Sequence, residues 1–396
     1  ADEEKEELKE INRYANSKGL EVIPCIQTLA HLNAITRWPA YKDMIDCNDI
    51  LIACDEKVLA FIDDMFRTLD ECFTSKVVNI GMDEAWMFGR GKYYDIHGDR
   101  KKSEIFVEHL NKVSEIGKKY GFTLCVWCDM FYNISECKSF WSDKPKIDED
   151  VRKLIPDNVE LVYWDYYNTK RKRYDKMNKS LKEAKEPTWF AGGLWCWESF
   201  APCNKFSMLT TKPALDSCIA NGVQNVCLTL WGDGGSECSK FATLPSLFYA
   251  SEYAKGNKSI KSIREKFYEK FGVGFEQFMN LDLTGKTDHW TNPNKYILYN
   301  DLFTGLYDTT IPETANEDYK ALSRKLALVK KNPEWGYIFE SMQALCNVIA
   351  LKADMGMRIR KAYDEKNMEE LKVIISDCKK LSKLVRVFHK AYHLDL

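Results

Sequence analysis

The sequence has no excess of either charge, since 57 lysines and arginines face 59 aspartates and glutamates, for a formal net charge of −2. It also lacks a basic block of the kind that neutralises phosphates, so nucleic acid is not an expected partner. No apolar run approaches membrane-spanning length and no signal-peptide pattern opens the chain, so no membrane association is expected. The chain begins at Ala1 without an initiator methionine, as a processed or truncated product would.

Cysteine is plentiful, with 14 residues, but the short, even spacing of a disulfide framework is absent. Several cysteines, such as Cys25 and Cys227, lie inside apolar, strand-like runs, which is typical of buried free thiols in a reducing compartment. Cys125 and Cys128 have C-x-x-C spacing, yet on a strand this odd separation directs the sulfurs to opposite faces. We therefore expect no metal and no other cofactor.

Strand-like and helical segments alternate through residues 1–254. Strands are predicted at residues 20–27, 77–81, 122–127, 159–164, 188–194 and 226–230. Helices are predicted over residues 1–19, 58–69, 103–120, 171–186 and 213–221. Such alternation indicates parallel βαβ units and an α/β fold.

The opening helix has no strand before it, so the six strands favour a (β/α)8 TIM-type barrel of which six βα units are visible. A doubly wound open sheet is the alternative, but the glycine-rich phosphate turn typical of it is missing after the first strand.

Beyond residue 254 the strand signal stops and helical periodicity dominates. Leu371, Ile374, Cys378 and Leu381, for example, recur at helical spacing. We expect an N-terminally incomplete barrel domain over residues 1–254 and an all-helical C-terminal domain over residues 255–396. The helical domain has no obvious chemistry and is interpreted as a scaffold or as the surface of a homodimer.

The carboxyl ends of barrel strands converge on one mouth, where barrel enzymes keep their chemistry. The side chains predicted there are His31, Asp83, Glu84, Trp127, Asp129, Tyr163, Asp165, Trp195, Trp197, Glu198, Trp231 and Asp233. Indole faces take the apolar face of a pyranose, and carboxylates accept its hydroxyl hydrogens. The set indicates a sugar site, although a single Trp could also cap the barrel core, and Asp129 or Glu198 could cap a helix.

Asp83 and Glu84 are neighbours in the sequence at the end of an apolar strand. The usual retaining glycosidase needs two carboxylates about 5 to 5.5 Å apart on opposite sides of the scissile bond, and sequence neighbours suit that poorly. They suit a reaction in which a 2-acetamido sugar supplies its own nucleophile. Glu84 would protonate the leaving oxygen, while Asp83 orients the amide N–H and stabilises the oxazolinium charge.

The run Ile80-Gly81-Met82-Asp83-Glu84-Ala85 resembles the Gly-x-Asp-Glu signature of glycoside hydrolase family 20, the β-N-acetylhexosaminidases. Within that family, sequences of the bacterial intracellular branch are similar to the segment Pro24-Cys25-Ile26-Gln27-Thr28-Leu29-Ala30-His31. The resemblance implies a cytoplasmic bacterial enzyme whose substrates are amino-sugar glycans. It implies the removal of terminal GlcNAc or GalNAc from β-glycosides with retention.

The resemblance also implies roles for the site residues. Asp83 is similar to the acetamido-orienting aspartate, Glu84 to the general acid/base, and His31 to the histidine that hydrogen-bonds the acid. Tyr163 resembles the tyrosine that donates to the acetamido oxygen. The other positions resemble walls of the acetamido pocket or ligands of the sugar: Trp127, Asp165, Trp195, Trp197, Trp231 and Asp233.

The family pattern includes an arginine on the first strand and an acidic residue after the second, and this chain has no counterpart of either. We therefore expect about one hundred further residues, the size of two βα units, to precede it. Two other hypotheses stay open. One is a non-catalytic N-acetylhexosamine-binding protein, or a fragment inactive without its first two strands. The other is a glycosidase of another barrel family that uses Glu84 with Glu198.

Overall fold

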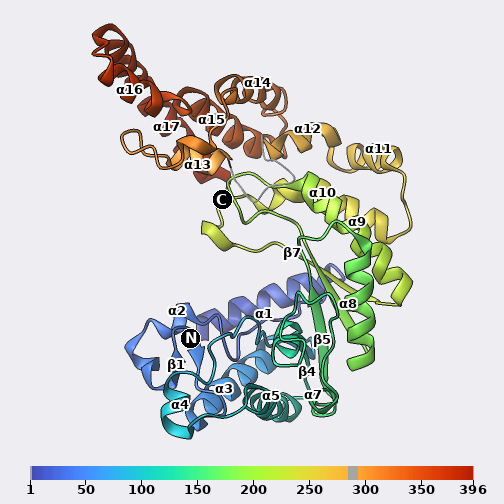
Figure 1. Cartoon of the computed structure of the whole chain (residues 1–396). Helices are drawn as coiled ribbons and strands as arrows, with labels where there is room; N and C mark the ends of the chain where they lie inside the picture. Colours follow the sequence, from blue (N-terminus) through green and yellow to red (C-terminus); the bar gives the residue numbers. More distant parts are fainter. Residues whose placement is uncertain (1, 284–292, 396) are drawn as a thin grey trace. The chain divides into compact units, whose positions relative to one another are not determined.

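The computed structural model describes residues 2–283 and 293–395 (Figure 1). The chain forms two compact units, one made of residues 1–191 and 216–227 and the other of residues 192–215 and 228–396. The domain boundary predicted after residue 254 stays a prediction.

A parallel sheet runs through the first unit, with its strands in chain order. Across the sheet the order is β3 (Val77–Asn79), β4 (Thr123–Trp127), β5 (Val159–Trp164), β6 (Thr188–Gly193) and β7 (Asn225–Thr229). The pairs from β3 to β6 are parallel. A doubly wound sheet reverses its strand order at a switch point, whereas uninterrupted succession is the pattern of a (β/α)8 barrel. The predicted barrel-type fold is thus confirmed.

The strand predicted at residues 20–27 is wrong in extent. Only Cys25 pairs, as an isolated parallel bridge to Asn79. The Ile26 N–H donates to Asn79 O at 2.8 Å, and the Asn79 N–H donates to Pro24 O at 3.0 Å. Because Pro24 has no N–H of its own, the ladder does not extend toward residue 20, although in the other direction the Thr28 N–H donates to Ile80 O at 3.2 Å. Five parallel strands and one bridging segment therefore stand where six strands were predicted.

One helix precedes the strands and four others connect them. They are α1 (Asp2–Ser17), α3 (Glu56–Cys72), α5 (Lys102–Lys119), α8 (Arg171–Ala184) and α9 (Asn204–Asn221). The side chain of Asp55 caps α3 by accepting the N–H groups of Lys57 and Val58. Helix α9 begins earlier than predicted, and Pro213 lies inside it instead of near its start.

Short elements occupy the loops of the first unit: α2 (Asn33–Thr36), the 3-10 helix η1 (Pro39–Met44), the antiparallel strands β1 (Ile45–Cys47) and β2 (Ile50–Leu51), α4 (Lys92–His97), α6 (Asp129–Asn133) and α7 (Glu149–Arg152). The sheet supplies the core beneath them. Successive residues of β4, from Leu124 to Trp127, are all buried, as in a parallel strand covered on both faces. The cysteines are free thiols, as predicted, but the predicted burial is wrong for Cys25, which is exposed, and for Cys227, which is only partly buried.

The described part of the second unit is helical after β7, which confirms the helical C-terminal region; residues 284–292 and 396 of that prediction lie outside the described residues. The helices are α10 (Leu244–Ala254), α11 (Ile260–Phe271), α12 (Phe275–Met279), α13 (Pro293–Tyr299), α14 (Ala315–Ala327), α15 (Gly336–Lys352), α16 (Met355–Asp364) and α17 (Met368–Asp395), with 3-10 turns η2 (Asp233–Gly235), η3 (Lys240–Thr243), η4 (Asn280–Asp282) and η5 (Asp308–Thr310). The buried helix α15 packs against α14 and α17. No helix in the described ranges is both long and apolar enough to cross a membrane.

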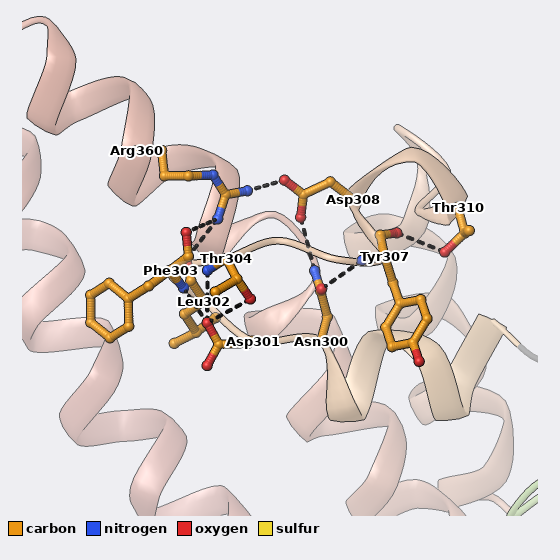
Figure 2. Close-up of polar contacts among 9 residues, drawn as sticks. All are labelled: Asn300, Asp301, Leu302, Phe303, Thr304, Tyr307, Asp308, Thr310 and Arg360. Carbon is orange, nitrogen blue, oxygen red and sulfur yellow. Dashed lines mark hydrogen bonds and ion pairs between the residues drawn. The ribbon is translucent and has the colours of Figure 1, made fainter.

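The segment after α13 is held by one arginine of α16 (Figure 2). The Arg360 guanidinium donates to Leu302 O at 2.7 Å and Phe303 O at 3.3 Å, and it pairs with the Asp308 carboxylate. The other oxygen of Asp308 accepts from the Asn300 amide at 2.9 Å. An irregular turn is thereby fixed to a helix through charge-assisted hydrogen bonds.

Candidate active site

Asp83 and Glu84 lie on a sharply turned loop directly after β3. Gly81, Met82 and Glu84 have φ angles of +70°, +66° and +50°. Left-handed backbone at two non-glycine residues in so short a stretch is strained, and such strain clusters at functional sites. The side chain of Asp83 is 18% exposed and that of Glu84 is 43% exposed. One carboxylate is therefore enclosed by protein, and its neighbour is open to solvent.

His31 reaches both carboxylates. Its Nε2 atom lies 3.3 Å from Asp83 Oδ2 and 3.6 Å from Glu84 Oε2. The hydrogen bond with Asp83 raises the pKa of His31 to about 9, against the opposing effect of partial burial. The imidazole is therefore a cation at neutral pH. The structure brings together the three residues that the sequence placed nearest the chemistry, with the histidine closest to the aspartate.

Gln27 was not among the predicted site residues, but it contacts Asp83. Its Nε2 donates to Asp83 Oδ1 at 3.3 Å, and its Oε1 is buried without a hydrogen-bond partner among the described residues. The side chain also lies against Gly81, where an added Cβ would come within 1.8 Å of Gln27 Oε1. The one available signal was its place at the end of the predicted first strand, where barrel enzymes carry functional groups.

Asp129, which the predicted catalytic set left out, contacts this loop from the start of α6. It is fully buried, and its Oδ2 accepts the backbone N–H of Glu84 at 2.9 Å. Burial raises its pKa to about 7. The sequence placed Asp129 at a strand end but left open whether it capped a helix. The structure instead connects it to the Asp83–Glu84 loop.

Trp127, the last residue of β4, also touches this loop. It is 5% exposed, and its backbone N–H donates to Gly81 O at 3.3 Å. The end of β4 therefore supports the turn that carries the two carboxylates. Its predicted role as a wall of a sugar pocket stays a prediction.

Tyr163 and Asp165, at the end of β5, are bonded to each other. The Tyr163 hydroxyl donates to Asp165 Oδ2 at 2.7 Å, and both residues are buried. Asp165 Oδ1 accepts the N–H groups of Tyr167 and Asn168 at 3.0 and 3.1 Å. Burial and the Asp165 carboxylate raise the pKa of the Tyr163 hydroxyl well above its ordinary value, so it remains a donor. In this structure the pair belongs to an internal network at the strand end.

The remaining predicted residues belong to the second unit. The rings of Trp195 and Trp197 stack, with centroids 4.5 Å apart and planes at 26°, and both are buried. The backbone N–H of Trp195 donates to Ser207 Oγ at 2.8 Å. These two indoles, which the sequence offered as alternatives for one pocket wall, thus form a single cluster.

Trp231 and Asp233 follow β7, and Glu198 follows β6. The Trp231 carbonyl accepts from Lys240 Nζ at 2.9 Å. Burial raises the pKa of Glu198, and the Asp233 carboxylate adds to this while Lys295 opposes it. The charges of Glu198 and Asp233 therefore influence each other, with the Lys295 ammonium close enough to oppose the effect.

Two family models match the sequence. The model of the glycosyl hydrolase family 20 catalytic domain matches residues 4–192. The model of the Glycoside Hydrolase 20C C-terminal domain matches residues 275–395.

Two named relatives are hexosaminidase D proteins. The chain is 26% identical over 169 residues to that of Bos taurus, which covers 40% of this chain and 46% of the relative. It is 24% identical over 169 residues to that of Homo sapiens, which covers 40% of this chain and 32% of the relative. The chain therefore spans less than half the length of these relatives.

Among solved structures, the chain is similar to a β-N-acetylhexosaminidase from Bacteroides fragilis, with a TM-score of 0.49, 17% identity, and coverage of 69% of this chain and 56% of that one. It is also similar to a chitobiase from Flavobacterium johnsoniae, with a TM-score of 0.47, 14% identity, and coverage of 94% and 65%. The matches to a catalytic and a C-terminal domain of one family extend over most of the sequence, and the chain belongs to glycoside hydrolase family 20.

Proposed function

We propose that this protein is an exo-acting β-N-acetylhexosaminidase that releases terminal GlcNAc or GalNAc from β-glycosides with retention. The observation that carries the proposal is the strained turn that presents two adjacent carboxylates beside the His31 imidazole. The Asp83 carboxylate is enclosed by protein, and the Glu84 carboxylate is open to solvent. Family membership and the similarity to proteins named hexosaminidase D support the reaction class.

In the first step, Glu84 donates its proton to the glycosidic oxygen as the bond from C1 to that oxygen breaks. The carbonyl oxygen of the substrate's own acetamido group forms a bond to C1, which gives an oxazolinium ion and releases the alcohol. Asp83 accepts the amide N–H and stabilises the positive charge on the ring. Adjacent carboxylates suit this division of labour, because neither has to reach the far side of the sugar.

In the second step, Glu84, now ionised, takes a proton from water as the water oxygen attacks C1 on the face the alcohol left. The bond from C1 to the amide oxygen breaks, and the acetamido group is restored. Two inversions at C1 give net retention. The 43% exposure of the Glu84 side chain supports this exchange of protons with water and leaving group.

The first step requires Asp83 to be negatively charged and Glu84 to be protonated. Two donors support that distribution, because the Gln27 amide faces Asp83 Oδ1 and the His31 ring faces Asp83 Oδ2. The pKa of about 9 for His31 keeps the ring charged at neutral pH. The cation lies 0.3 Å closer to Asp83 than to Glu84, the difference between 3.6 and 3.3 Å.

We assign sugar binding to the remaining predicted residues. Trp127, Trp195, Trp197 and Trp231 would offer flat apolar faces, while Asp165 and Asp233 would accept hydroxyl hydrogens. Tyr163 would donate a hydrogen bond to the acetamido oxygen. To do so, its hydroxyl has to break the hydrogen bond with Asp165 and form one with the substrate. A cytoplasmic location and a homodimer built on the helical C-terminal region also remain proposals.

The test is hydrolysis of an aryl β-N-acetylglucosaminide by the full-length protein. We expect Glu84→Gln and Asp83→Asn to lower kcat by at least about a hundredfold, since each removes a group used in the transition state. N-acetylglucosamine thiazoline, which mimics the oxazoline, should inhibit the wild type. Equal hydrolysis by wild type and Glu84→Gln would refute the proposal. Calorimetric binding of N-acetylglucosamine without turnover would favour the non-catalytic alternative.

A further inference from the structure

The backbone of Glu84 adopts a conformation that it does not favour by itself. Its φ of +50° lies in the left-handed region, which costs a residue with a Cβ about 1 to 2 kcal/mol. Such a conformation persists only where surrounding groups hold it. One such group is Asp129, whose Oδ2 accepts the Glu84 N–H at 2.9 Å across 45 residues of sequence.

Asp129 does not serve as the cap of its own helix. It is the first residue of α6, whose cap position is Cys128, and no side-chain capping bond is made there. Its two oxygens bond elsewhere: Oδ2 to Glu84 N and Oδ1 to the indole Nε1 of Trp164 at 3.4 Å. The carboxylate therefore connects the ends of β4 and β5 to the loop after β3.

Burying the Asp129 carboxylate is energetically unfavourable. Asp129 is 0% exposed, and removing its charge from water without full compensation is unfavourable. Burial accordingly raises its pKa to about 7, with a further contribution from the nearby Asp83 charge, while the Glu84 N–H bond acts in the opposite direction. An apolar residue would fill the space at lower cost, so the bond to the Glu84 backbone is the feature that needs explaining.

We propose that Asp129 is a positioning residue for Glu84, and that its bond to the Glu84 N–H holds the left-handed turn that aims the Glu84 carboxyl at the glycosidic oxygen. This inference rests on the proposed hexosaminidase function. It concerns the placement of Glu84 and not that of Asp83, which is held separately by Gln27 and His31.

The test uses aryl β-N-acetylglucosaminides whose leaving groups differ in their need for a proton. A methoxyphenol leaves poorly without protonation, whereas a dinitrophenol leaves readily without it. In the full-length protein, Asp129→Ala should lower kcat/KM, which reports the first step alone, about a hundredfold on the methoxyphenyl glycoside and less than about tenfold on the dinitrophenyl glycoside. Glu84→Gln should show the same pattern with a larger loss.

A matched control removes side-chain hydrogen bonds at the opposite end of the same sheet. Asn158 precedes β5, accepts from Ser114 Oγ at 2.6 Å and donates to Phe122 O at 3.2 Å. Asn158→Ala should lower the melting temperature while leaving the ratio of the two kcat/KM values as in the wild type. If Asp129→Ala does not fold, Asp129→Asn takes its place. An asparagine carboxamide has one oxygen for two N–H donors, so a smaller loss with the same leaving-group pattern is expected.

The outcomes separate this inference from the function on which it rests. A wild type inactive on both glycosides would overturn the proposed function. An active wild type and impaired Glu84→Gln, together with folded Asp129 variants whose kcat/KM falls equally on both glycosides or not at all, would overturn the role of Asp129 alone.

Discussion

The imidazole of His31 is shared unequally between Asp83 and Glu84, with Nε2 lying 3.3 Å from Asp83 Oδ2 and 3.6 Å from Glu84 Oε2. His31 itself has a left-handed backbone, with φ of +59°. Both partners of this contact are therefore held on strained loops at the carboxyl end of the sheet. The histidine supports the charge on the aspartate more directly than it supports the proposed acid.

This contact predicts a pH-dependent contribution to stability. The pKa of His31 is raised from 6.5 to about 9, so the folded state binds the proton more tightly. The stabilisation is fully present below pH 6.5 and is lost as pH rises through about 9. Urea unfolding of wild type and His31→Gln should show a difference in free energy that shrinks over this window. His97→Gln, on the exposed helix α4, serves as the control, and a His31 difference that is constant with pH would contradict the assignment.

Gly81 cannot carry a side chain without displacing Gln27. A Cβ there would lie 1.8 Å from Gln27 Oε1, and the φ of +70° adds left-handed strain. Gly81→Ala should reduce the free energy of unfolding by about 3 kcal/mol or more.

Gly19→Ala is the matched control for this change. Gly19 has a similar φ of +73° but nothing within 4 Å of an added Cβ. The Gly19→Ala variant should therefore lose only about 1 kcal/mol of unfolding free energy, measured by chemical denaturation. Equal losses of unfolding free energy in the two variants would mean that the close approach of Gln27 to Gly81 does not contribute to the cost of the substitution.

The Gln27 amide should support the negative charge that the proposed mechanism places on Asp83. In the wild type, Gln27 Nε2 lies 3.3 Å from Asp83 Oδ1. The Gln27→Glu substitution places a second carboxylate there, and its negative charge disfavours the charged aspartate that the mechanism needs. The acidic limb of the pH–rate profile should then move to higher pH by about one unit or more.

Gln27→Met fills similar space without a charge and provides the comparison. It should lower kcat without moving the acidic limb. If the two variants have the same pH–rate profile, the Gln27 contact has no electrostatic role in catalysis.

Arg360 should matter more for stability than an exposed arginine of the same helical region. Arg360 and Asp308 are 31% and 23% exposed, and Arg360 also donates to two carbonyls of the turn (Figure 2). Arg360→Met should cost about 2 to 3 kcal/mol, because it leaves the carboxylate and carbonyls without their donor.

The comparison is Arg264→Met, whose ion pair with Glu276 is 50% and 64% exposed. Solvent screens such a pair, so its loss should cost less than about 1 kcal/mol in thermal or chemical unfolding. A larger loss for Arg264→Met than for Arg360→Met would contradict this reading of the turn.

Much of the fold could be predicted because its signals are local. The run of β-branched and aromatic residues at 159–164 coincides with β5, and the stripe from Val58 to Leu69 lies within α3. The prediction failed where one residue changed the hydrogen bonding, as at Pro24, which reduces the first strand to a bridge at Cys25. The early start of α9 was likewise hidden by Pro213, which this helix tolerates in its interior.

The sequence by itself determined the family and the central pair, because adjacency of Asp83 and Glu84 after an apolar strand is a property of a few consecutive residues. Tertiary structure decided which groups surround that pair. Gln27 meets Asp83 across 56 residues, and Asp129 meets the Glu84 backbone across 45. Neither contact leaves a periodic or spacing signal, since each depends on which strand ends the parallel sheet brings side by side.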